Sequence, residues 1–275
     1  MDFFGEKGTL VVATKHEKET IVGPLFQKAF PWFLLPCGPL DTDAFGTFSG
    51  EKERIGTPLE VLKQKCQAAS QLVQADFYFA TEASFGPHPE CPFLPFYEEW
   101  VMLYAPSLAL EWVEVKRSTQ TNFRTMEITT WQGLVKFAWE IGFPEHALIL
   151  RQDHFLEKGI RDWDMLRHFF RQRALDKPFI VETDMRAMCN PTRQSAIADL
   201  TLQLIQRLKQ PCPSCKKPGF GLQKPWRGLR CEACHLPTHL AKGTLLSCPF
   251  CGCQVEEMFP HLSRADPAYC SFCNP

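Results

Sequence analysis

Eight cysteines in the last quarter of the chain restrict its fold more than any other feature. They form four pairs with two residues inside each pair: Cys212 and Cys215, Cys231 and Cys234, Cys248 and Cys251, and Cys270 and Cys273. A pair with this spacing presents two thiolates from one tight turn, so two pairs complete the tetrahedral site that zinc prefers. The sequence therefore predicts two structural zinc ions, each held by four cysteines with no open position for catalysis.

The spacing between the pairs leaves two arrangements open. Fifteen residues separate the first pair from the second, and 18 separate the third from the fourth, as in zinc ribbons. Sequential pairing is the simplest arrangement, and it gives a tandem zinc-ribbon region with a first ribbon over 209–242 and a second over 243–275. In the alternative, a cross-braced arrangement, the pairs alternate between the two metals.

Basic residues gather around the first two cysteine pairs. The stretch from Arg207 to Lys242 holds eight Lys or Arg and one acidic residue, although the formal net charge of the chain is −1. Between the pairs, cations alternate with Phe220 and Trp226, a combination that binds phosphates and stacks on bases in nucleic-acid-binding proteins. Because so small a region also needs both rings for its own core, packing is favoured over nucleic-acid contact.

Residues 1–208 have the pattern of an α/β domain. Short apolar segments at 9–13, 32–36, 76–80, 147–150 and 179–182 alternate with segments of helical period. Two further apolar segments flank Pro106 and predict a hairpin. Thr57, Pro58 and Glu60 have the pattern of a capping box at a helix start. The predicted fold class is α/β, with a mixed sheet flanked by helices and a small C-terminal zinc-ribbon region.

The cysteines and the first residues of the chain bear on its location. The N-terminal residues lack the basic start and apolar segment of a signal peptide, and no apolar run approaches about 18 residues. Thirteen cysteines without an export signal indicate metal ligation and free thiols rather than disulfides. We therefore expect a cytoplasmic protein that does not enter a membrane; the sequence does not indicate its oligomeric state.

Polar clusters follow three of the apolar segments. They are Lys15, His16 and Lys18; Glu82, Ser84 and His88; and Asp184, Arg186 and Arg193. Because parallel strands bring their carboxyl ends to one edge of a sheet, we expect the three clusters to share a pocket. The alternative is a set of independent turns, with Asp184 and Arg186 forming a buried pair that braces its own turn. Asn190 and Pro191 then predict the start of a helix.

The side chains of these clusters suit a phosphorylated ligand. The predicted ligand contacts are Lys15, His16, Lys18, Ser84, Arg186 and Arg193, together with Asp43 from an acidic loop at 41–51. Glu82 and Asp184 would bind Mg²⁺ or orient water, and His88 would transfer protons, so these three are the candidate catalytic residues.

Several motifs resemble an uncharacterised bacterial family with an α/β body and a C-terminal four-cysteine zinc-ribbon tail. They include Ala83-Ser-Phe-Gly-Pro-His-Pro89, Thr183-Asp-Met-Arg186, Asn190-Pro-Thr-Arg193 and the end of the chain from Cys270 to Pro275. This resemblance implies the layout of the chain and no particular activity.

A fainter resemblance is to the house-cleaning nucleoside triphosphate pyrophosphatases. Residues 13–18, the segment Thr57-Pro-Leu-Glu60 with Lys65, and Glu82 occur in the order of that family's motifs, without its asparagine or its paired aspartates. The resemblance implies a Mg²⁺-dependent phosphoanhydride hydrolase. Two functions thus compete: a protein that binds or hydrolyses a nucleotide or other phosphorylated ligand, and a non-catalytic zinc-ribbon adaptor for nucleic acid or protein.

Overall fold

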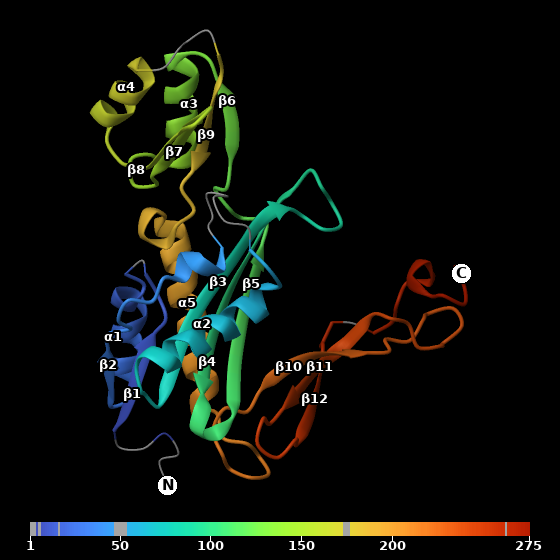
Figure 1. The fold of residues 1–275 in the computed structure, drawn as a ribbon. Coiled ribbons are helices and arrows are strands. Elements are labelled where there is room, and N and C mark those ends of the chain that lie inside the picture. Colours follow the sequence, from blue (N-terminus) through green and yellow to red (C-terminus); the bar gives the residue numbers. More distant parts are fainter. Residues whose placement is uncertain (1–3, 5–6, 16, 47–53, 173–176, 262) are drawn as a thin grey trace. The chain divides into compact units, whose positions relative to one another are not determined.

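The computed structural model describes residues 4, 7–15, 17–46, 54–172, 177–261 and 263–275 (Figure 1). The chain divides into two compact units, one over Phe4–Gln203 and one containing Leu204–Pro275. The first unit combines helices with a mixed sheet, and the second contains the cysteine pairs. The predicted α/β class with a C-terminal cysteine-rich region is therefore confirmed.

A five-stranded mixed sheet forms the first part of the α/β unit. Its strands are β1 (Gly8–Val12), β2 (Trp32–Leu35), β3 (Phe77–Pro87), β4 (Pro95–Ala105) and β5 (Leu110–Ser118), in the order β2-β1-β3-β4-β5. β1 runs parallel to β2 and β3, whereas β3, β4 and β5 are antiparallel. The predicted hairpin at Pro106 is confirmed as the β4–β5 connection.

The third apolar segment extends further than the sequence indicates. Residues 81–87, expected to form a loop after a strand at 76–80, continue β3 instead. The reason is that β3 pairs with β4 at every position from Tyr78 to Pro87. Glu82 and Ser84 are therefore strand residues, while His88 follows the end of the strand.

Helices α1 (Glu19–Ala29) and α2 (Pro58–Leu72) cover opposite faces of this sheet. On one face, the ring of Phe26 in α1 packs edge-on against Phe79 of β3. On the other, Leu62 and Cys66 of α2 pack in a core with Tyr78. Because side chains alternate along a strand, Phe79 and Thr81 face α1, whereas Tyr78 and Glu82 face α2.

The predicted capping box starts α2 and supports a stability prediction. The Thr57 hydroxyl accepts the Glu60 backbone N–H (3.3 Å), and the Glu60 carboxylate accepts the Thr57 N–H (2.7 Å). We expect Thr57→Ala to lower the free energy of unfolding by about 1 kcal/mol because one backbone N–H loses its acceptor. Urea denaturation measures this, with Thr57→Ser as the control that keeps the hydroxyl. Equal stability of the alanine variant would contradict it.

A second, antiparallel sheet completes the α/β unit. Its strands are β6 (Thr125–Ile128), β7 (Leu148–Gln152), β8 (Phe155–Ile160) and β9 (Phe179–Thr183), in the order β6-β9-β7-β8. α3 (Trp131–Ile141) and α4 (Trp163–Arg171) lie beside this sheet (Figure 1). They supply Leu134, Phe137 and Leu166 to its core. β9 lies between β6 and β7, so it does not share a sheet with β1 and β3. The expectation of one common sheet edge for all three polar clusters is therefore wrong.

The second unit is built on a three-stranded antiparallel meander. After α5 (Pro191–Lys209), β10 (Leu222–Arg227), β11 (Ala241–Ser247) and β12 (Gln254–Met258) pair in chain order. Gly243 of β11 allows the close approach of β12, since a Cβ there would lie 2.1 Å from the Glu257 carbonyl oxygen. Across the described residues, no helix combines the length with the apolar character that a membrane crossing requires.

Candidate metal centres and a buried charge cluster

The eight paired cysteines form two tetrads in the second unit. One contains Cys212, Cys215, Cys248 and Cys251, and the other contains Cys231, Cys234, Cys270 and Cys273. Within each tetrad all the sulfur atoms lie within 4.8 Å of one another, and four of the Sγ–Sγ distances are 3.6–3.9 Å. Tetrahedral zinc with Zn–S bonds of about 2.3 Å would hold its sulfurs about 3.8 Å apart. Each tetrad could therefore hold one metal ion, and the spacing fits zinc.

The tetrads alternate along the chain, so sequential pairing is wrong and the cross-braced alternative holds. The strand register supplies the physical reason. β10 pairs with β11 so that Leu222 lies opposite Ser247, which brings the first cysteine pair beside the third. A bridge between Cys231 and Ala265 likewise brings the second pair toward the fourth.

The surroundings of the tetrads agree with a structural role. The backbone N–H groups of Cys273 and Phe272 lower the pKa of the Cys270 thiol to about 7, whereas the hydrogen bond with Cys234 raises the pKa of the Cys273 thiol to about 12. Phe220 is buried in a small core with Cys212 and Cys248, so its predicted packing role is confirmed. The ammonium of Lys242 lies 3.8 Å from the ring centroid of Trp226. The aromatic rings of the basic connector are thus engaged within the unit.

In the α/β unit, charged side chains are buried on the α1 face of the first sheet. Arg193 of α5 makes two bonds to the Glu99 carboxylate of β4 (2.8 and 3.1 Å), with the two residues 2% and 0% exposed. Arg193 also donates to the Met185 carbonyl oxygen (2.8 Å). Lys18, which precedes α1, is 8% exposed and donates to the Thr81 hydroxyl (2.8 Å). Asn190 caps α5 as predicted, by accepting the Arg193 N–H (3.0 Å).

A second set of charges lies on the α2 face. Lys65 of α2 donates to the Glu82 carboxylate of β3 (2.5 Å), and both residues are buried. Arg54 reaches the other oxygen of Glu82 (3.5 Å) and donates to the carbonyl oxygen of Ala83 (3.2 Å) and the hydroxyl of Ser84 (3.3 Å). Lys65 also donates to the carbonyl oxygen of Thr81 (3.4 Å). Cations thus surround Glu82.

The two sets meet along one edge of β3. β1 ends at Val12, and the backbone N–H of Ala13 donates to the Phe79 carbonyl oxygen of β3 (2.7 Å). Since alternate carbonyls point the same way, those of Thr81 and Ala83 face this edge beyond the end of β1, where Lys65 and Arg54 bind them. We call the six charged residues gathered here the β3-edge cluster: Lys18, Arg54, Lys65, Glu82, Glu99 and Arg193.

The β3-edge cluster contains four cations and two carboxylates, an excess of two positive charges when Lys18 is protonated, and Arg54 is its one partly exposed member. Burial lowers the pKa of Lys18 to about 7, and repulsion by Arg193 and Lys65 adds to this effect. Burial raises the pKa of Glu99, whereas Arg193 opposes that change. Buried charge is costly, and the lowered pKa of Lys18 reflects that cost.

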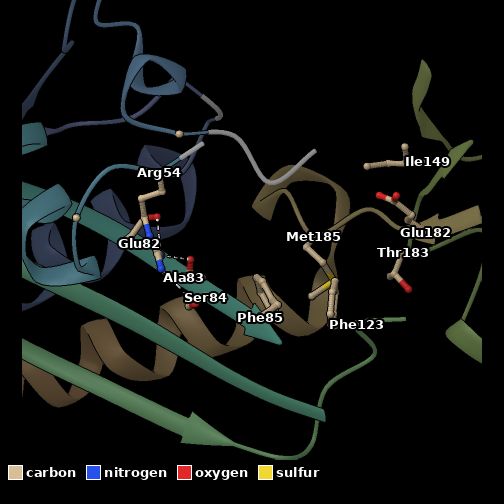
Figure 2. A pocket seen from close by; sticks show the side chains of 12 residues that line it. Arg54, Glu82, Ala83, Ser84, Phe85, Phe123, Ile149, Glu182, Thr183 and Met185 are labelled. Carbon is tan, nitrogen blue, oxygen red and sulfur yellow. Dashed lines mark hydrogen bonds and ion pairs between the residues drawn. The ribbon is translucent and has the colours of Figure 1, made fainter. Parts of the chain in front are cut away.

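A cavity of about 340 Å³ adjoins the cluster. In Figure 2, Arg54, Glu82 and Ser84 lie on one side of it, with Glu182, Thr183 and Ile149 opposite and Phe85, Phe123 and Met185 between them. The end of β3 and the end of β9 therefore line a common pocket, although the two strands belong to different sheets. Its lining combines a charged wall with an apolar floor.

The structure brings some predicted site residues together and places others apart. Lys18, Glu82, Ser84 and Arg193 belong to the β3-edge cluster or contact it. Other predicted residues have different partners. Lys15 pairs with Asp41 and Asp43 (2.9 Å each), and the His88 ring accepts the Glu90 N–H and packs edge-on against Phe96. His16 lies outside the described residues.

Asp184 and Arg186 form an ion pair that braces their own turn, as the alternative of independent turns predicts. The Arg186 guanidinium donates to the carboxylate of Asp184 (2.6 Å), which also accepts the Gly159 N–H (3.1 Å). Because cations hold the carboxylates of both Glu82 and Asp184, these contacts do not support a Mg²⁺ site. In the described part of the chain, the two cysteine tetrads are the clusters with the ligands and spacing for a metal ion.

Three members of the β3-edge cluster are absent from the sequence-based site: Arg54, Lys65 and Glu99. The sequence does indicate that Glu99 is buried, because Glu99 alternates with the apolar residues Val101, Leu103 and Ala105 on the buried face of β4. A carboxylate on such a face indicates a buried partner, but the alternation does not identify Arg193 as that partner.

The chain is an α/β protein with a C-terminal region whose two cysteine tetrads could each hold a metal ion. Residues 65–275 match the domain of unknown function DUF6671, and the chain belongs to this family. A search of curated proteins found no match. The predicted resemblance to an uncharacterised family is thus confirmed, whereas the resemblance to nucleoside triphosphate pyrophosphatases receives no support.

Proposed function

We propose that the α/β unit binds a phosphorylated small molecule, such as a nucleotide, at the β3-edge cluster. The observation that carries this proposal is the position of the partly exposed Arg54 guanidinium, which lines a cavity beside the buried cations Lys18, Lys65 and Arg193. Phosphoryl groups supply two negative charges and several acceptor oxygens, and arginine matches their geometry. In the second unit, two zinc ions would have a purely structural role.

The walls of the cavity suggest how such a ligand would lie. Its phosphoryl group would contact Arg54 at the charged wall, and an organic group would cover the apolar floor formed by Phe85, Phe123 and Met185. The volume of about 340 Å³ is within the usual range for small-molecule sites, about 300–1,000 Å³. Binding alone is proposed, because the carboxylates that hydrolysis would use are engaged by Lys65, Arg54 and Arg186.

This proposal predicts the effect of removing Arg54. We expect pyrophosphate and nucleotides to raise the thermal stability of the protein, because a ligand that binds the folded state stabilises it. Arg54→Ala should weaken binding about 10- to 100-fold, the loss typical of a hydrogen bond to a charged group. Isothermal titration calorimetry measures both affinities. Lys63→Ala is the control, since Lys63 lies on α2 but pairs with Glu111 (2.7 Å).

Two results would overturn the proposal. One is the absence of stabilisation by pyrophosphate and by every nucleotide tested. The other is unchanged affinity in the Arg54→Ala variant, which would place any phosphorylated ligand elsewhere on the protein.

A further inference from the structure

Glu182 gives the cavity a second charged wall. It lies on β9, which pairs with β7 so that Ile149 is directly opposite Glu182. Because side chains alternate along a strand, Val181 packs in the core of the second sheet, whereas Glu182 and Ile149 project from the other face and line the cavity. Figure 2 shows both of these residues across the cavity from Arg54.

The Glu182 carboxylate can accept hydrogen bonds from a ligand. Arg151 of β7 places its Nε 3.4 Å from one carboxylate oxygen, and the Glu182 side chain is 21% exposed. The two oxygens of a carboxylate offer about four acceptor sites, so acceptor sites remain beside this ion pair. An ionised carboxylate donates no hydrogen bond. The part of a ligand that meets Glu182 must therefore be a donor.

From the two walls we infer that the phosphorylated ligand is a guanine nucleotide whose base donates to Glu182. The inference rests on the proposed function and specifies the organic group of its ligand. Guanine presents two neighbouring donors, N1–H and the 2-amino group, which match the two oxygens of a carboxylate. The amino group of adenine lies between two ring nitrogens that only accept, and these would face the carboxylate unfavourably. Cytosine and uracil also place an acceptor beside the donor.

The apolar floor between the walls suits a planar base. The ring centroids of Phe85 and Phe123 lie 5.7 Å apart, and Met185 lines the cavity with them (Figure 2). Aromatic and thioether side chains make favourable contacts with other rings. With the phosphoryl group at Arg54, a base on this floor would direct its edge toward Glu182.

The base selectivity of the unaltered protein tests this inference. Calorimetry would compare guanosine diphosphate (GDP), inosine diphosphate, adenosine diphosphate (ADP) and pyrophosphate. Inosine diphosphate lacks only the 2-amino group of GDP, so we expect it to bind about 10-fold more weakly, the loss of one hydrogen bond to a charged group. ADP should bind about 10- to 100-fold more weakly than GDP, the discrimination typical of a base contact with two hydrogen bonds.

Glu182→Gln should change this selectivity. Glutamine offers one donor and one acceptor, as the adenine edge does, so ADP should bind the variant at least as tightly as GDP. The affinity for pyrophosphate, which has no base, should stay the same. Glu127→Gln is the matched control. Glu127 of β6 lies opposite Ile180 on the same face of the sheet as Glu182, but the described residues that line the cavity do not include it.

The outcomes separate this inference from the proposed function. If either analogue binds as tightly as GDP, or if pyrophosphate binds and no nucleotide does, the guanine assignment is wrong and the proposed function stands. An unchanged ratio of GDP to ADP affinity in Glu182→Gln overturns the role of Glu182. If neither pyrophosphate nor any nucleotide binds, the proposed function itself is wrong. Should the variant fail to fold, the comparison of nucleotides in the unaltered protein decides.

Discussion

Chelation of metal is expected to unfold the region Leu204–Pro275, and elemental analysis of the reduced, metal-replete protein should give two zinc ions per chain. The apolar core of this unit around Phe220 is small, and every residue of β12 is exposed. Metal binding must therefore supply much of its stability. In zinc-finger peptides the apparent binding free energy is about 10–16 kcal/mol at pH 7. Hydrogen exchange before and after chelation measures the loss of protection in β10–β12.

Single cysteine variants test the role of the tetrads. Cys231→Ser should lower the zinc content by about one ion, because it removes one of four ligands from the second tetrad. Cys253→Ser is the control: Cys253 packs against the core around the first tetrad but belongs to neither one. A zinc content of one or none in the unaltered protein, or full protection of β10–β12 after chelation, would contradict the prediction.

Replacement of Arg193 is expected to have the largest effect in the α/β unit. Arg193→Met should lower the free energy of unfolding by about 3–5 kcal/mol, because it leaves the buried Glu99 carboxylate without its partner. It also removes the donor to the Met185 carbonyl oxygen. Urea denaturation of the variant measures the change. Adding Glu99→Gln should recover part of the loss, since the uncompensated charge is then gone.

A surface ion pair on the same helix gives the control for this measurement. Lys116 of β5 pairs with Asp199 of α5 at 3.4 Å, and both side chains are more than one-third exposed. Lys116→Met should therefore change stability by less than about 1 kcal/mol. If Arg193→Met is equally mild, the Arg193–Glu99 pair does not hold α5 to the sheet as its burial implies.

The sequence correctly predicted features that depend only on residues a few positions apart in the chain. The Thr57 capping box, the hairpin at Pro106 and the helix start at Asn190 and Pro191 are all correct, because each follows from groups within a few positions. For the cysteine tetrads, the sequence predicted the ligands but not their pairing. Their ligands follow from local spacing, but their pairing depends on the register of β10 against β11, which the spacing does not encode.

The candidate site was only partly predicted, because its contacts join segments that are far apart in the chain. Lys18 and Glu82 stood out as polar residues near apolar segments, yet the sheet partners of β9 could not be read from its own five residues. Glu99 and Arg193 are separated by 94 positions. Their ion pair depends on how α5 packs against β4, and no local pattern in either segment specifies that packing.

The alternation of the cysteine tetrads determines how this region would respond to a protease. Each tetrad takes two ligands from before residue 235 and two from after residue 247. A single cut between these positions, such as a tryptic cut after Lys242, would therefore leave two fragments bridged by both metal ions. Under sequential pairing the same cut would have left each metal on its own fragment. Here the nicked halves would separate only after both metal ions had been stripped.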